Sequence, residues 1–186
     1  MGKETLISVD GEFTGPIPGP FSMISLGAVA YDRVGVELSA FKTNMEELTG
    51  SRRDDSTMVW WLGQENAWEL ATVDPVSAVS GITSFSEWIK GLPGKPKLMG
   101  WPYSVDFLFI YWYYVNFLGA IPPFGFDGID IKTYAMRALS IKNISDVSRT
   151  VVRKKLGIDN TDYTHDPVDD AREQAKLYFG LRDLKG

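Results

Sequence analysis

The order in which the sequence places its strands and helices is the feature that most restricts its fold. Segments rich in β-prone residues are bounded by turn residues, as in the Gly/Pro-rich stretch 15–20. A short Asp-Arg link joins the second of these segments to the third and predicts a hairpin. We expect strands at residues 6–13, 22–31, 35–43, 97–101 and 128–131.

Helical segments occupy most of the remaining chain. The stretch 102–118 stops at Gly119, the residue type that commonly ends helices. Its most apolar part, 107–118, is too short to span a bilayer and indicates a buried helix. We expect helices at residues 54–71, 84–92, 102–118, 132–139, 145–156 and 167–184. Consecutive strands followed by alternating strands and helices predict an α/β fold with a mixed central β-sheet flanked by α-helices.

The length and the cysteine content restrict the class of protein. A chain of 186 residues predicts one domain that spans residues 1–186. The first residues lack the basic region and the long apolar run of a signal peptide. The chain contains no cysteine, which excludes disulfides and thiolate zinc sites and fits a reducing compartment. We therefore expect a cytoplasmic protein with no membrane contact.

The charge permits nucleic acid as a partner without indicating it. A net charge of −5 is unfavourable, since phosphate binding usually needs positive charge. Bound divalent cations would, however, reverse the sign of a site lined by carboxylates. The basic residues Arg149, Arg153, Lys154 and Lys155 form a cluster. This cluster fits a solvated helix face and a phosphate-binding surface equally well.

Acidic residues on the first strand and the apolar helix are candidates for metal binding. Asp10 and Glu12 are two positions apart, so both side chains project from the same side of a strand. Buried carboxylates repel one another and lose hydration, and Mg²⁺ or Mn²⁺ is the natural compensation. The alternative is an edge strand with both acids in water. Asp106 stands in the first turn of the apolar helix, where an acid is often only a partner of the helix dipole.

The stretch 164–171 carries the most information. Asp166 takes the N-cap position of a helix, and Pro167 takes the first helical position. His165 and Asp170 then occupy the two places that meet in a hydrophobic staple. An imidazole and a carboxylate are thus brought close together. Apolar residues would be expected at these two places if the pair served only to stabilise the helix. His165 is the only histidine of the chain, and its alternative is a solvated loop residue.

Together these motifs resemble a known family. A strand with D-x-E near the N-terminus, an aspartate in the middle and a terminal H-x-x-x-x-D resemble the three motifs of the DEDDh, or DnaQ-like, 3′-5′ exonucleases. The segment 127–138 also resembles the strand and helix before the third motif. The resemblance covers nearly the whole chain and implies the ribonuclease H-like fold. The start 10–13 and the Trp60-Trp61…Gln64 helix further resemble the small exoribonucleases of phage and mycobacteria, a narrower match that implies a homodimer.

The resemblance also implies a role for each motif residue. Asp10 would bridge two divalent cations, Mg²⁺ or Mn²⁺, and Glu12 and Asp170 would complete the first site. Asp106 would hold the second ion, directly or through water. His165 would take the proton from the attacking water. The implied reaction releases nucleoside 5′-monophosphates from the 3′ end of a single-stranded nucleic acid.

Aromatic residues near the motifs are candidates for stacking on terminal bases, which is sequence-tolerant. Phe13 follows the first motif, Trp101 precedes the second, and Trp60 and Trp61 stand on the helix 54–71. Trp60 and Trp61 also fit buried positions at their spacing.

Two alternatives remain open at this point. A catalytically silent nucleic-acid-binding domain would keep the same fold, although all five candidate catalytic positions hold suitable residues. The second alternative is DNA as the substrate. Sugar selectivity depends on contacts to the 2′-OH, which no motif reports, so only the narrower resemblance favours RNA.

Overall fold

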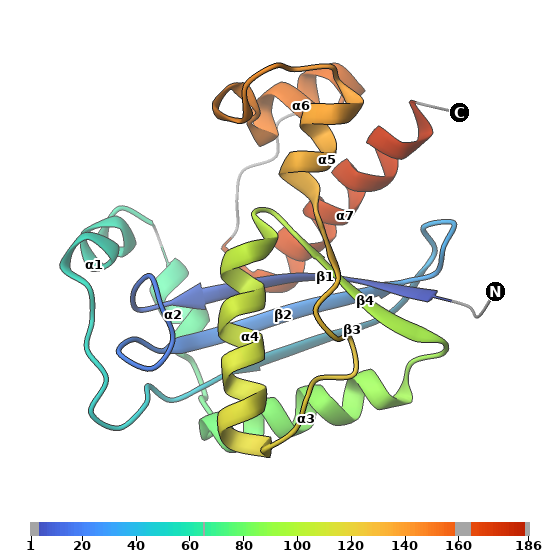
Figure 1. Cartoon of the computed structure of the whole chain (residues 1–186). Coiled ribbons are helices and arrows are strands. Elements are labelled where there is room, and N and C mark those ends of the chain that lie inside the picture. The colour runs from blue at the N-terminus through green and yellow to red at the C-terminus, as the bar shows by residue number, and fades with distance from the viewer. Residues whose placement is uncertain (1–3, 65, 159–164, 185–186) are drawn as a thin grey trace.

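The computed structural model describes residues 4–64, 66–158 and 165–184. The centre of this described part is a five-stranded sheet in the order β3-β2-β1-β4-β5 (Figure 1). The strands are β1 (Glu4–Phe13), β2 (Met23–Tyr31), β3 (Glu37–Asn44), β4 (Lys95–Gly100) and β5 (Gly128–Asp130). Because β1 pairs antiparallel with β2 and parallel with β4, the sheet is mixed, as predicted.

Helices cover both faces of this sheet. They are α1 (Asp55–Leu62), α2 (Ala67–Thr72), α3 (Ala78–Gly91), α4 (Tyr103–Leu118), α5 (Ile131–Ala138), α6 (Arg149–Leu156) and α7 (Pro167–Asp183), with a 3₁₀ turn at Ile144–Asp146. One core cluster packs α3 and α4 on the sheet around Phe85 and Phe109. The other packs α5, α6 and α7 on the opposite face around Ile131 and Leu177. In Figure 1, α3 lies below the sheet and α4 crosses in front of it, whereas α5, α6 and most of α7 lie above it.

The helix expected at 54–71 is in fact two helices. α1 ends at Gly63, and α2 begins after Asn66, whose φ is 59°. A residue in the left-handed region cannot continue an α-helix. The helical spacing of Trp60, Gln64 and Ala67 therefore suggested a continuity that the backbone does not have.

Two other helices begin elsewhere than expected. α3 begins at Ala78, well before Ser84, because the hydroxyl of Ser77 accepts a hydrogen bond from the backbone N of Ser80 and caps the helix. α6 begins at Arg149 with Ser148 as its cap. The start of the expected helix 145–156 falls instead in the 3₁₀ turn.

The apolar segment expected at 102–118 forms α4. It ends at Gly119, whose φ of 59° suits glycine. Phe109, Tyr113 and Tyr114 are almost fully buried, which confirms the prediction of a buried helix. Within the residues that the structure describes, no helix has the length and apolar character needed to cross a membrane. The cytoplasmic location stays a prediction.

Candidate active site

Asp10 and Glu12 project from β1 on the face that α7 covers. Ile7 and Val9 belong to the opposite core, under α3 and α4, so the even-numbered side chains of β1 face α7. Glu12 is 7% exposed, and the side chain of Asp10 is 14% exposed. The edge-strand alternative is wrong, because β1 lies between β2 and β4.

Gly27 brings the start of α7 against these acids. It stands opposite Asp10 in the antiparallel pair of β1 and β2. A β carbon at Gly27 would lie 2.2 Å from the carbonyl carbon of Pro167, so only glycine admits the helix at this distance. The first turn of α7 therefore lies directly on the sheet beside Asp10.

Asp106 reaches the same place from the first turn of α4. β4 runs parallel to β1, so the chain enters α4 near the C-terminal end of β1. Asp106 Oδ1 accepts a 3.0 Å hydrogen bond from the backbone N of Gly11, between the two acids of β1. A β carbon at Gly11 would meet the ring of Phe13 at 2.5 Å and Asp106 Oδ1 at 3.4 Å. The space beside Gly11, between Asp10 and Glu12, is therefore one that suits glycine.

The start of α7 has the predicted geometry. Asp166 is the N-cap, and its Oδ1 accepts hydrogen bonds from the backbone N of Val168 at 2.9 Å and from that of Asp169 at 3.4 Å. His165 has a φ of 51°, a conformation that is rare outside glycine and recurs at functional sites. Asp170 is 7% exposed. The cap therefore turns His165 back towards Asp170, which lies one turn into the helix.

The side chains of Glu12, His165 and Asp170 form a group that fits a divalent cation. Each offers one ligand atom, and these atoms all lie within 4.8 Å of one another. Carboxylate oxygens are the ligands that Mg²⁺ and Mn²⁺ prefer. The charges of Asp10 and Asp106 act on this group as well. All five residues expected from the sequence thus converge at the C-terminal end of β1.

Burial raises the pKa of each acid in the cluster. The pKa of Asp10 lies well above its ordinary value, first because of burial and then because of the three neighbouring acids. Burial is also the first cause for Glu12, with a pKa of about 8, for Asp106, about 7, and for Asp170, about 6. The guanidinium of Arg149 opposes all these shifts. Ionised acids this close repel one another, and a bound cation would relieve the repulsion.

The raised pKa values predict that stability without metal falls as the pH rises. An acid with a raised pKa in the folded state stabilises the fold below its unfolded pKa, and this contribution is lost as the pH rises through the folded value. The pH range over which the stability falls therefore extends from about 4, the ordinary pKa of an acid, to about 8, the pKa of Glu12. In EDTA, we expect the Tm to be several degrees lower at about pH 8 than at about pH 5.

Adding Mg²⁺ or Mn²⁺ should raise the Tm more at the higher pH, because the ions bind the ionised acids of the folded state. Differential scanning fluorimetry at both pH values, with EDTA and with excess metal, measures this. A Tm in EDTA that does not fall with pH, or a metal effect that is equal at both, would contradict the electrostatic account.

The aromatic candidates differ in exposure. Trp61 is 3% exposed, and its indole N–H donates to the carbonyl oxygen of Phe13, so its ring supports the site from inside. Trp101 is 9% exposed. Phe13 is half-buried and stacks on Phe109 with ring centroids 4.0 Å apart. Trp60 is 45% exposed and meets the ring of His165 edge to face at 5.3 Å. Of the two tryptophans considered both for stacking and for a buried position, Trp61 is therefore the buried one, and Trp60 is the one with an exposed ring.

Two residues that the sequence motifs did not place at the site act on Asp10. Gln174 is fully buried, and its Nε2 donates to Asp10 Oδ1. It stands one helical turn after Asp170, so the spacing i, i+4 on α7 could have indicated it. Arg149 Nη2 lies 3.8 Å from the same oxygen. In the sequence, Arg149 could not be distinguished from the other basic residues of its cluster.

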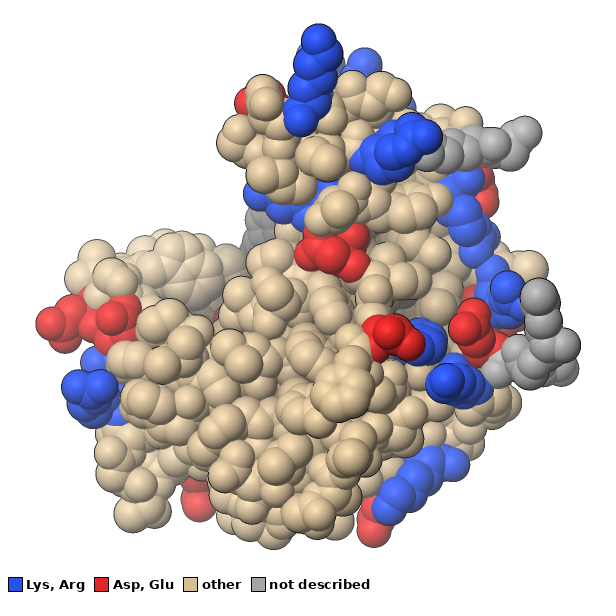
Figure 2. Space-filling view, in the orientation of Figure 1, with Lys and Arg blue, Asp and Glu red and all other residues tan. Residues whose placement is uncertain are grey.

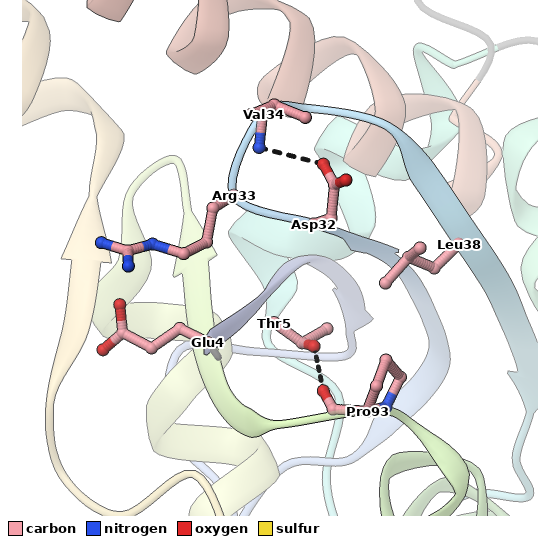
Figure 3. A pocket seen from close by; sticks show the side chains of 7 residues that line it. All are labelled: Glu4, Thr5, Asp32, Arg33, Val34, Leu38 and Pro93. Atoms are coloured by element: carbon pink, nitrogen blue, oxygen red, sulfur yellow. Dashed lines mark hydrogen bonds between the residues drawn. The ribbon is translucent and has the colours of Figure 1, made fainter. Parts of the chain in front are cut away.

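A separate pocket lies at the other end of the sheet. It has a volume of about 340 Å³, and residues beside the β2–β3 turn line it, among them Glu4, Arg33 and Leu38 (Figure 3). Since a strand rises about 3.3 Å per residue, Glu4 is roughly 20 Å along β1 from Asp10. This pocket is therefore not part of the acidic cluster.

Comparisons with known sequences point to one kind of enzyme. A family model described as 3′-5′ exoribonuclease Rv2179c-like domain matches residues 5–179. The 3′-5′ DNA exonuclease Cap18 of Escherichia coli is 28% identical in an alignment 184 residues long, which covers 95% of this chain and 90% of Cap18.

Several solved structures share the fold. The nuclease domain of 3′hExo, a DEDDh family member bound to rAMP, has a TM-score of 0.70 at 17% identity, with 98% of this chain and 92% of that chain covered. Pop2p of S. pombe, in its Mg²⁺- and Mn²⁺-bound form, has a TM-score of 0.67 at 14% identity, with 96% and 82% covered. A 3′-exonuclease on the histone mRNA stem-loop has a TM-score of 0.72 at 16% identity, with 98% of this chain and 64% of that longer chain covered. These likenesses confirm the ribonuclease H-like fold.

Proposed function

Because the chain belongs to the 3′-5′ exoribonuclease Rv2179c-like domain family, we propose that residues 1–186 act as one exonuclease domain that shortens single-stranded RNA from its 3′ end. The enzyme class, a 3′-5′ exonuclease, follows from the family, and the catalytically silent alternative no longer applies. The observation that carries the assignment of the site is the convergence of four acids, three of them buried and Asp10 largely so, and His165 at the end of β1.

Two divalent cations, Mg²⁺ or Mn²⁺, are proposed as cofactors. Asp10 would bridge them, Glu12 and Asp170 would complete one site, and Asp106 would hold the other ion. Such ions activate water and stabilise the leaving oxygen in an in-line attack on phosphate. The carboxylate donor set and its raised pKa values support this assignment.

His165 is proposed as the general base. Burial, and then the charge of Arg149, lower its pKa, so the imidazole is neutral near pH 7 and can accept a proton. The water oxygen attacks phosphorus as its proton passes to the imidazole. The bond between phosphorus and the 3′ oxygen of the preceding nucleotide breaks, and that oxygen stays on the shortened chain. The released product is a nucleoside 5′-monophosphate.

Trp60 and Phe13 are proposed to stack on the terminal bases. Trp60 combines an exposed ring with contact to His165, and Phe13 directly follows Glu12 on β1. Stacking of this kind accepts any base, which suits an enzyme that removes successive nucleotides. Trp61 and Trp101 would then serve as the buried support of these surfaces. The homodimer implied by the narrower resemblance stays a prediction.

RNA is proposed as the preferred substrate because the matching family is described as exoribonucleases. DNA is the competing possibility, because the similar protein Cap18 is described as a DNA exonuclease. We expect RNA to be shortened about ten-fold faster or more than DNA of the same sequence, since a hydrogen bond to a 2′-OH in a buried site contributes that much. Initial rates on matched single-stranded oligonucleotides, labelled at the 5′ end, measure the preference. Faster shortening of DNA would overturn the sugar assignment and leave the exonuclease intact.

A further inference from the structure

Arg149 stands beside the acidic cluster, where a metal site alone does not explain it. It is the first residue of α6, directly after the cap Ser148. Its Nη2 donates to the carbonyl oxygen of Trp101 at 3.2 Å and lies 3.8 Å from Asp10 Oδ1. The side chain is 16% exposed. The guanidinium thus lies next to the acid that is proposed to bridge both metals.

An acid of α7 holds this arginine from the other side. Arg149 Nη1 lies 3.4 Å from Glu173 Oε2, and the other oxygen of Glu173 pairs with Arg153, which is 4% exposed. By contrast, the 3.8 Å between Arg149 and Asp10 is longer than a hydrogen bond. The carbonyl oxygen of Trp101 and the carboxylate of Glu173, both outside the acidic cluster, therefore help to hold Arg149 near Asp10.

The basic cluster of α6 divides into two kinds of residue. Arg149 and Arg153 are turned inward, whereas Lys154 and Lys155 are exposed. Figure 2 shows Lys and Arg side chains gathered over the upper part of the molecule, where α5 and α6 lie in Figure 1. The solvated-face interpretation thus suits the two lysines, and it does not suit Arg149.

A fixed cation at this position disfavours metal binding, because it repels the ions that the acids would hold. The group that it favours is an anion in the same place. In the proposed reaction that anion is the phosphate being cleaved, whose negative charge must be stabilised in the transition state. The planar guanidinium, with its paired N–H donors, matches two phosphate oxygens, which a single ammonium does not.

We infer that Arg149 binds the non-bridging oxygens of the phosphate of the 3′-terminal nucleotide, and that Glu173 and Arg153 hold it in position for this contact. The inference rests on the proposed function, since it assigns a substrate contact within the same site. The same phosphate remains on the product as its 5′-phosphate. A nucleoside 5′-monophosphate is therefore a direct probe of the contact, without turnover.

The test compares the binding of adenosine 5′-monophosphate and of adenosine by isothermal titration calorimetry in excess Mg²⁺. Arg149→Met should weaken binding of the monophosphate by about ten-fold to a hundred-fold, the range of a hydrogen bond to a charged group. Binding of adenosine, which lacks the phosphate, should change by less than about two-fold. The matched control Lys155→Met removes the same charge from an exposed position of α6 and should leave both affinities unchanged.

Three results would overturn the inference. The first is a wild-type protein that binds the monophosphate no better than adenosine. The second is an Arg149→Met variant that binds the monophosphate as tightly as wild type does. The third is a Lys155→Met variant whose affinity for the monophosphate falls as much as that of Arg149→Met. Where the methionine variant does not fold, Arg149→Lys keeps the charge and loses the paired donors. It should weaken monophosphate binding by about three-fold to ten-fold, and an unchanged affinity would again contradict the contact. Failure of the proposed function would be seen separately, as a wild-type protein that shortens no oligonucleotide.

Discussion

Replacing Asp10 with asparagine is expected to lower the exonuclease rate by about a thousand-fold or more while the protein remains folded. Asparagine keeps the shape of the side chain and an oxygen that can accept from Gln174, but it lacks the charge that would hold two cations. Initial rates on a 5′-labelled single-stranded oligonucleotide in excess Mg²⁺ or Mn²⁺ measure the loss.

The same substitution should raise stability in EDTA. The pKa of Asp10 is raised by burial and by its acidic neighbours, so its charged form costs folding free energy at neutral pH. We expect a Tm increase of about 2–4 °C or more, the change that corresponds to about 1 kcal/mol in a chain of this size. A variant that is inactive and less stable would indicate lost structure instead of a lost metal ligand.

Asp169→Asn is the matched control for this variant. Asp169 stands next to Asp170 on α7, but its side chain is exposed and pairs with Arg172 at 3.3 Å. Loss of this acid should leave the rate within about two-fold of wild type, since surface ion pairs contribute little. An equal loss of activity in both variants would mean that general charge near α7, and not the cluster, supports the reaction.

Replacing His165 with asparagine is expected to lower kcat by about a hundred-fold to ten-thousand-fold, the usual contribution of a general base. Metal binding should persist, because the four acids that are proposed as metal ligands are unchanged and His165 is proposed as the base. The KM should change little, since His165 is proposed to accept a proton and not to bind the nucleotide.

The pH profile separates this role from a structural one. His165 must be neutral to accept a proton, so the rate of the wild-type enzyme should fall as the pH decreases through the histidine pKa. Burial and Arg149 lower that pKa from its ordinary value of 6.5, so the fall should lie on the acidic side of this value. With the metal saturating at every pH, so that loss of metal from protonated acids does not contribute, His165→Asn should lose this limb of the profile. A variant that keeps both the limb and the rate would exclude His165 as the base.

The local geometry of the site follows from the sequence because each part depends on short-range rules. The period of two on a strand places Asp10 and Glu12 on one face. The cap Asp166 and the proline after it fix the start of α7 and thereby bring His165 near Asp170. No pairing between distant segments is needed for either conclusion.

The remaining features depend on how distant segments pack. Gly27 admits α7 to the sheet only because β2 pairs with β1 in the observed register, which no local pattern specifies. Trp60 and Trp61 are neighbours in sequence, yet one is 45% exposed and the other 3% exposed. Their difference arises because the ring of Trp61 packs between the end of β1, where it donates to the carbonyl oxygen of Phe13, and the alanines of α2. This packing depends on the helix break before α2, which the helical spacing did not indicate.

The most direct test of the central claim follows the products of the wild-type enzyme on a short single-stranded RNA. With the label at the 5′ end and Mg²⁺ or Mn²⁺ present, we predict a ladder that shortens by single nucleotides from the 3′ end, with nucleoside 5′-monophosphates as the released products. EDTA should stop the reaction. Internal cuts, shortening from the 5′ end, or a ladder that persists in EDTA would contradict a metal-dependent 3′-5′ exonuclease at the end of β1.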